Sequence, residues 1–143
     1  MEKSLLNINN KTVLITGATG FIGGRLAEIL SLKYDVNIKC LVRDLSKCSQ
    51  LARFDSIKFI YSSLSDTDKL KEAISNCDIV FHCAYDSSNQ QNNINGIKNL
   101  SNYCLKYGTR LVHVSTISVF EPLPDGILDE DSIMNPKGYK YAK

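Results

Sequence analysis

The stretch TVLITGATGFIG, residues 12–23, predicts a β-strand, a glycine-rich turn and the start of a helix. A β-branched run precedes Gly17, and from Phe21 onward apolar residues recur at helical spacing. Gly17 permits a tight turn out of the strand, Gly20 leaves room for a phosphate near the backbone, and Gly23 lets the helix pack on the sheet. The helix N-terminus offers unpaired N–H groups to an anion. This context favours a phosphate-binding turn over a simple packing turn.

Apolar runs of strand length alternate with helical patterns along the rest of the chain. Further strands are expected at residues 36–42, 57–60, 78–83 and 110–115. Helices are expected at residues 21–32, 46–53, 66–75, about 90–107 and from about 136, and Gly108 is the stop signal of the fourth. Five strands separated by helices predict an α/β fold with a doubly wound parallel sheet, because parallel neighbours need crossover connections.

The composition is that of one soluble globular domain over residues 1–143. Hydrophobic residues make up 43% and charged residues 22%, and the formal charge of +2 is too balanced for a protein that binds nucleic acid or a membrane surface. No apolar run approaches the roughly 20 residues that cross a bilayer, and the N-terminus lacks the pattern of a signal peptide. Five cysteines without a C-x-x-C pair indicate buried, reduced thiols and no metal site. We therefore expect a cytoplasmic protein.

The glycines are spaced Gly-x-x-Gly-x-x-Gly, one residue wider at the first step than in most dinucleotide dehydrogenases. The segment TGATGFIG, residues 16–23, resembles the short-chain dehydrogenase/reductase superfamily, and in particular its extended branch, which includes nucleotide-sugar epimerases, dehydratases and related reductases. The resemblance implies a Rossmann-like fold that binds a dinucleotide and acts by hydride transfer on a small molecule, such as a nucleotide sugar or a comparable hydroxyl or keto compound. It assigns cofactor binding in this turn to Gly17, Thr19, Gly20, Phe21, Ile22 and Gly23.

The end of the second expected strand bears on the choice between NAD and NADP. An acidic residue at this point would accept hydrogen bonds from the ribose hydroxyls of NAD. Val42 occupies that position, and Arg43 follows, whose guanidinium can hold the 2′-phosphate of NADP through paired N–H donors. Asp44 is the counter-evidence, because a shift of one residue would make it the acid of an NAD site, and Arg43 would then be a solvated residue. We expect NADP to be favoured over NAD.

Two later strand ends resemble the remaining cofactor contacts of the family. After the third strand, where the family often has an acidic residue followed by Leu or Ile at the adenine, this chain has Ser63 and Leu64. Cys83 and Ala84 end a segment that resembles the strand passing the cofactor ribose and pyrophosphate. Asn93 matches the structural or active-site asparagine of the helix that follows.

Three other polar residues have simpler expected roles. His82 and His113 lie inside apolar strands and are expected to be core residues with satisfied hydrogen bonds. Asp66 is expected to cap the following helix.

The segment YKYAK, residues 139–143, resembles the catalytic Tyr-x-x-x-Lys pair of the family. Tyr139 and Lys143 are four residues apart and share a face on a helix, whereas Tyr141 points elsewhere. The pKa of a free tyrosine, about 10, is too high for a base near neutrality, and a neighbouring lysine lowers it. On its own the pattern also fits two exposed helix residues.

The segment VHVSTISVF, residues 112–120, resembles the family strand that ends in a catalytic hydroxyl residue. Counting back from Val119 assigns this role to Thr116, which would hydrogen-bond the substrate oxygen as the proton moves. Epimerisation, dehydration and simple reduction share these residues, so the sequence does not separate them. A non-catalytic dinucleotide-sensing or scaffold module on the same fold is the alternative, and the presence of all three catalytic residues argues against it.

The resemblance covers residues 11–143 but only the first half of the family pattern, which continues into further strands and a substrate domain. We therefore expect a truncated portion of a longer enzyme, which by itself binds dinucleotide weakly and turns over little. In such a portion the fifth strand would be an unprotected sheet edge, which raises the possibility of a homodimer.

Overall fold

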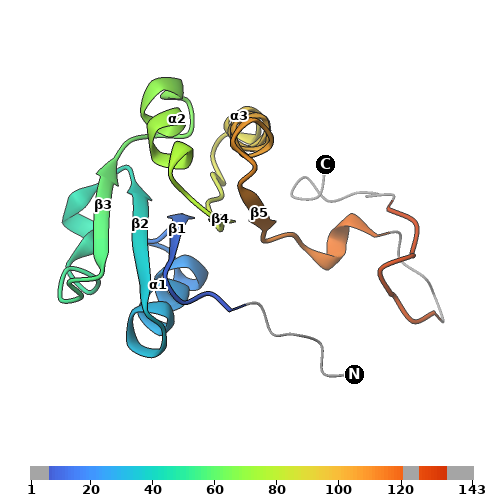
Figure 1. Ribbon diagram of the computed structural model, residues 1–143. Coiled ribbons are helices and arrows are strands. Elements are labelled where there is room, and N and C mark those ends of the chain that lie inside the picture. Colours follow the sequence, from blue (N-terminus) through green and yellow to red (C-terminus); the bar gives the residue numbers. More distant parts are fainter. Residues whose placement is uncertain (1–6, 121–125, 135–143) are drawn as a thin grey trace. The chain divides into compact units, whose positions relative to one another are not determined.

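The computed structural model describes residues 7–120 and 126–134. The chain divides into two units, Met1–His113 and Val114–Lys143, and the first contains the sheet and the α-helices (Figure 1). In the second unit, a short 3-10 helix, η2 (Ile117–Val119), precedes an isolated antiparallel bridge between Phe120 and Met134. The helix expected from residue 136 lies outside the described residues.

The first unit is built on a parallel sheet with the strand order β3-β2-β1-β4-β5. Its strands are β1 (Lys11–Thr16), β2 (Val36–Val42), β3 (Ile57–Tyr61), β4 (Ile79–His82) and β5 (Arg110–His113). The chain adds β2 and β3 on one side of β1 and then crosses back to add β4 and β5 on the other side. This reversal confirms the doubly wound sheet and creates a topological switch point beside the end of β1.

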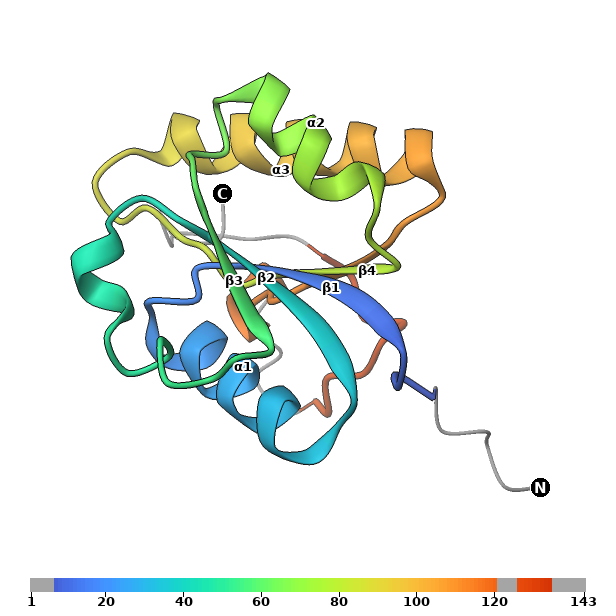
Figure 2. The same cartoon turned by 60° about the vertical axis from the view of Figure 1, so that its left-hand side comes forward.

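Helices cover both faces of the sheet (Figure 2). Alternate residues of β1 serve the two faces, since Val13 and Ile15 pack in one core cluster and Leu14 in the other, all without solvent exposure. On the first face the cluster includes Ala27 and Leu30 of α1. The helices are α1 (Phe21–Lys33) on that face, and α2 (Thr67–Ser75) and α3 (Gln90–Tyr107) on the opposite face.

The opposite core joins both of its helices to the central strands. Leu70 of α2 and Leu100 of α3 are fully buried there together with Val80 of β4. A sheet that is apolar on both sides explains why its strands are near-continuous apolar runs in the sequence.

Capping residues set the ends of α2 and α3. The Asp66 carboxylate accepts a hydrogen bond from the backbone N–H of Lys69 at 3.2 Å and so begins α2. Asn89 caps α3 through its side-chain oxygen, and Gly108 ends that helix in the left-handed conformation at φ +66°.

The prediction of a helix over residues 46–53 is wrong in both the type and the length of the helix. A 3-10 helix, η1 (Leu45–Cys48), forms there and is followed by turns. The Asp44 side chain caps its first turn. Cys48 and Leu51, the two buried residues of the segment, are three apart, and this spacing is satisfied by successive turns as well as by an α-helix.

The two histidines have different environments, although the sequence predicts a core position for both. His82 is 3% exposed, and its Nδ1 lies 2.6 Å from the Thr16 Oγ1, which confirms the expectation for this residue. His113 is exposed, so the same expectation is wrong for it. It lies on β5, which within the described residues pairs with β4 alone. The two imidazole rings stack with their centroids 5.1 Å apart.

All five cysteines are free thiols, three of them buried and two, Cys77 and Cys83, half-buried. Burial raises the pKa of Cys40 to about 12 and that of Cys104 to about 11, so both stay protonated. Among the described residues no three His, Cys, Asp or Glu side chains gather to hold a metal ion. In the same part of the chain no helix is both long and apolar enough to cross a bilayer.

The buried histidine makes stability depend on pH. Burial, aided by the neighbouring His113, lowers the pKa of His82 from 6.5 to about 4. The unfolded chain therefore takes up this proton at a higher pH than the folded chain, and the stabilisation present above about pH 6.5 is lost as the pH falls toward 4. Between pH 7 and pH 5 we expect the free energy of unfolding to fall by about 2 kcal/mol in urea titrations.

His82→Asn should remove most of this pH dependence, whereas His113→Asn, which changes the exposed ring of the pair, should keep most of it. An unchanged pH slope in His82→Asn would contradict this explanation.

Candidate functional site

A pocket of about 370 Å³ opens at the carboxyl ends of the central strands, beside the switch point. Its walls come from the turn after β1, the end of β2, the segment after β3, and the loop between β4 and α3. Crevices at this position are where open α/β sheets bind ligands. The predicted cofactor residues that line the pocket are Gly17, Thr19, Gly20, Arg43, Ser63, Leu64, Cys83, Ala84 and Asn93.

The glycine-rich turn meets the beginning of the β4–α3 loop backbone to backbone. Gly17 has φ +70°, and a Cβ on it would lie 2.7 Å from the Ala84 nitrogen. A Cβ on Gly23 would lie 2.8 Å from the carbonyl carbon of Gly17, so the first turn of α1 also folds tightly against the loop. Gly17 is therefore required for the turn and also for a contact with the beginning of the β4–α3 loop that the motif alone does not reveal.

The N-terminus of α1 carries no group that competes with an anion. Gly20 is its N-cap and makes no side-chain capping hydrogen bond, and the first turn has no acidic residue. Phe21 and Ile22, predicted to contact the cofactor, are exposed by 93% and 53% and are not among the residues that line the pocket. The backbone at this end of the helix suits a phosphate group.

One threonine hydroxyl joins the ends of the two strands at the switch point. Thr16 Oγ1 contacts the His82 ring and accepts a hydrogen bond from the backbone N–H of Ala84 at 3.3 Å. The carbonyl of Thr16 accepts from the N–H of Cys83 at 3.2 Å. Burial raises the pKa of the Cys83 thiol, so the side chain presents a neutral wall to the pocket.

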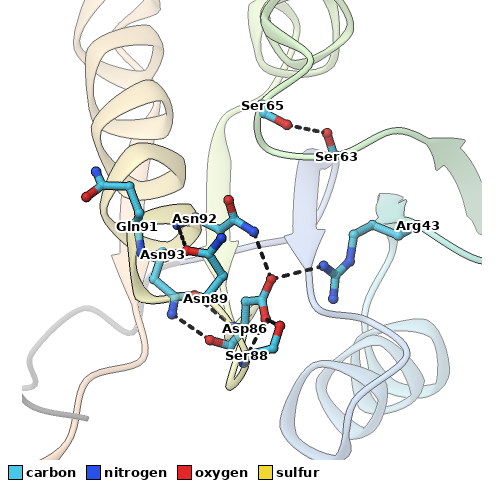
Figure 3. A network of polar contacts seen from close by, with 9 residues as sticks. All are labelled: Arg43, Ser63, Ser65, Asp86, Ser88, Asn89, Gln91, Asn92 and Asn93. Atoms are coloured by element: carbon cyan, nitrogen blue, oxygen red, sulfur yellow. Dashed lines mark hydrogen bonds and ion pairs between the residues drawn. The ribbon is translucent and has the colours of Figure 1, made fainter. Parts of the chain in front are cut away.

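A network of polar contacts fixes the β4–α3 loop (Figure 3). The Asn93 side chain accepts from the N–H of Asp86 at 2.7 Å and donates to its carbonyl at 2.9 Å, which gives Asn93 a structural role. The Asp86 carboxylate accepts from the N–H and hydroxyl of Ser88 at 3.0 and 2.6 Å, and from the Asn92 amide at 3.1 Å. These hydrogen bonds hold the pKa of Asp86 well below its usual range. Sequence reasoning missed Asp86, which has no place in the quoted motifs.

The end of β2 brings charges of both signs to the pocket. The Arg43 guanidinium is exposed, and its Nη1 lies 3.5 Å from the Asp86 Oδ2. The Asp44 carboxylate accepts from the N–H and hydroxyl of Ser46 at 2.9 and 2.6 Å, and the Ser46 hydroxyl is the first cause of its lowered pKa. Asp44 is therefore an η1 cap that also lines the pocket, so both candidates of the sequence analysis are present at the site.

The wall after β3 combines a hydroxyl group with an apolar side chain. The Ser63 and Ser65 hydroxyls are 2.8 Å apart. The Leu64 carbonyl accepts from the Asn99 amide at 3.0 Å, and its side chain packs on Gly96, where a Cβ would come within 2.8 Å of it. Ser63 and Leu64 thus line the pocket, and α3 holds Leu64 there, whereas their contact with an adenine stays a prediction.

Of the three predicted catalytic residues, only Thr116 lies within the described part of the chain. Thr116 caps η2 in the second unit, and its hydroxyl accepts from the N–H of Ser118 at 3.3 Å. Tyr139 and Lys143 lie outside the described residues. Their joint action stays a prediction.

The backbone contact at Gly17 can be tested against a glycine that shares its conformation but not its neighbours. Gly108 has φ +66°, and a Cβ there would meet no atom within 4 Å. We expect Gly108→Ala to lower the free energy of unfolding by about 1 kcal/mol, the cost of the left-handed conformation alone. Gly17→Ala adds the clash with Ala84 and should lower it by about 3 kcal/mol. Urea denaturation measures both, and equal losses would disprove the importance of the close approach.

Comparison with known proteins identifies the family of the chain. Residues 13–143 match the NAD dependent epimerase/dehydratase family. Over 118 residues the chain is 33% identical to the sterol-4-alpha-carboxylate 3-dehydrogenase, decarboxylating, of Dictyostelium discoideum, a match that covers 77% of this chain and 34% of that protein.

Two solved structures share the fold. The UDP-glucuronic acid 4-epimerase of Bacillus cereus in complex with NAD has a TM-score of 0.77 at 24% identity, covering 92% of this chain and 48% of that one. A short-chain dehydrogenase/reductase of Veillonella parvula in complex with NADP has a TM-score of 0.65 at 22% identity, covering 76% and 49%. The chain therefore spans about half the length of these structures or less, and it belongs to the NAD dependent epimerase/dehydratase family, the extended branch of the short-chain dehydrogenases/reductases.

Proposed function

We propose that the pocket binds a dinucleotide, NADP in preference to NAD, for hydride transfer in a longer enzyme. The observation that carries the proposal is the position of the pocket at the switch point, with the Gly17 turn as its floor and Arg43 at the end of β2. The chain shares its fold with one solved structure in complex with NAD and one in complex with NADP, so the choice between the two rests on Arg43.

Each wall of the pocket suits one part of a dinucleotide. The backbone N–H groups from Gly17 to Gly23, those of Phe21 and Ile22 included, would receive the diphosphate. Ser63 and Leu64 would border the adenine, and Arg43 would hold the 2′-phosphate.

The segment at Cys83 and Ala84 would pass the ribose and the pyrophosphate. Asn93 would act by keeping the loop in place, as its two hydrogen bonds to the Asp86 backbone suggest.

The proposed chemistry is exchange of a hydride at a carbinol carbon of a nucleotide sugar or a comparable hydroxyl or keto compound. The bound nicotinamide would supply or accept the hydride. Tyr139 would transfer the proton of the substrate oxygen, Lys143 would lower the pKa of that phenol, and Thr116 would hydrogen-bond the same oxygen. A cytoplasmic location and association of two copies through the β5 edge remain predictions.

The assignment of Arg43 is tested by titrating the chain with NADP⁺ and NAD⁺ in a calorimeter. Arg43→Ala should weaken NADP⁺ binding about tenfold or more, because a hydrogen-bonded ion pair with the phosphate is lost, and should change NAD⁺ binding less than twofold. Arg53→Ala is the matched control, since Arg53 is also exposed but pairs with Glu28 away from the pocket. Equal affinity of the unchanged chain for both dinucleotides would overturn the NADP preference, and binding of neither would overturn the proposed function.

The catalytic assignment is tested by Tyr139→Phe in the full-length gene product. Loss of the phenol should lower turnover at least about a hundredfold while cofactor affinity changes less than twofold. Tyr141→Phe, two residues away, should retain turnover. If Tyr139→Phe kept its turnover, Tyr139 would have no catalytic role. If the unchanged full-length protein showed no turnover, the chain would be part of a binding module.

A further inference from the structure

Arg43 meets a fixed carboxylate inside the pocket. The Asp86 side chain is only 17% exposed, and both of its oxygens accept hydrogen bonds from the β4–α3 loop and the start of α3. The Arg43 side chain is 70% exposed and makes one contact with this carboxylate, at 3.5 Å (Figure 3). The carboxylate is therefore the immobile member of the pair, and the guanidinium is the member that can reorient.

The strand order shows toward which side of the pocket the Asp86 carboxylate attracts the Arg43 side chain. Arg43 follows β2 and Asp86 follows β4, and β1 lies between these two strands. The ion pair therefore passes over the end of β1. The segment after β3, with Ser63 and Leu64, is on the other side of β2. The contact with Asp86 thus turns Arg43 toward β4 and away from the wall proposed for the adenosine half of the cofactor.

We propose that Asp86 is a specificity-determining residue, which competes with the 2′-phosphate of NADP for the guanidinium of Arg43. This inference rests on the proposed function, because it presupposes a dinucleotide in the pocket. To hold the 2′-phosphate, Arg43 must give up Asp86, whereas NAD⁺ offers only a hydroxyl and leaves the ion pair in place. Asp86 therefore reduces the preference for NADP that Arg43 alone would provide.

Within the described residues, Asp86 is the carboxylate that pairs with Arg43, whereas Asp44, which also lines the pocket, pairs with Lys47. Lys47 is 3.9 Å from Asp44, and Asp44 is bonded to Ser46. The lowered pKa of Asp86 means that its charge is present across the pH range in which dinucleotides are bound. An exposed ion pair is a weak interaction, so the expected effect is modest and limited to NADP.

The test is the ratio of the affinities for NADP⁺ and NAD⁺, measured calorimetrically with the full 143-residue chain. Asp86→Asn keeps an oxygen that can accept from Ser88 and removes the charge, and it should raise the ratio about two- to fivefold. Asp86→Ser, a second neutral variant with a polar side chain, should act in the same direction if the Asn variant fails to fold. Asp55→Asn removes one charge from the loop before β3, outside the pocket, and should leave the ratio unchanged.

The Arg43→Ala background separates competition from a merely structural role. If Asp86 acts by holding Arg43, its substitution changes the ratio only while Arg43 is present. If Asp86 serves only to shape the loop, its substitution changes both affinities alike in both backgrounds, which overturns the proposal. A lower ratio in Asp86→Asn also overturns it, because Asp86 would then orient Arg43 toward the phosphate. If the unchanged chain binds neither dinucleotide, the proposed function itself fails, and this result is visible before any variant is measured.

Discussion

The structure of the site depends on the contact between the backbone of Gly17 and the backbone at Ala84. The separation leaves no room for a side chain, since a Cβ on Gly17 would lie 2.7 Å from the Ala84 nitrogen. The Thr16 hydroxyl closes the same junction by bonding both His82 and Ala84. Because the order in which the chain adds strands reverses between β1 and β4, this contact sets the shape of the switch-point pocket.

The pocket combines a neutral floor with charged walls. The turn, in which Thr19 lines the pocket, and the first turn of α1 carry no charged side chain, and their backbone N–H groups suit the diphosphate that every dinucleotide contains. The charges that we propose to discriminate between NADP and NAD are on two loops, Arg43 after β2 and Asp86 after β4. Under this proposal, binding and selectivity are carried by different elements, so loop substitutions would change the cofactor preference without changing the core.

Most of the first unit could be predicted from the sequence, because local signals and packing agree there. β1 and α1 follow from one apolar run and one glycine motif, and the start of α2 and the end of α3 follow from Asp66 and Gly108. The prediction of a helix over residues 46–53 was wrong because two buried residues three apart fit both a 3-10 helix and an α-helix. The core position expected for His113 was wrong because an apolar strand pattern does not show how much of a strand is covered, and within the described residues β5 has β4 as its one neighbour in the sheet.

The features of the site that could not be predicted from the sequence are contacts between segments distant in the chain. Asp86 is 43 positions from Arg43 by their numbers and belongs to no motif, so only the strand order brings the two together. The role of Thr16 at the junction likewise depends on a strand 66 residues away. Neither relation leaves a periodic or spacing signal in the chain.

The central claim is that a dinucleotide lies across the Gly17 turn, between the ends of β2 and β4. Amide chemical-shift mapping with NADP⁺ tests it most directly, since each backbone N–H reports its own surroundings. The account predicts that the largest shifts fall on residues 17–23 and on Ala84 and Asp86, and that the amino ends of the strands, such as Lys11 and Val36, stay unchanged. Shifts clustered at the amino ends of the strands, or none in the glycine turn, would contradict it.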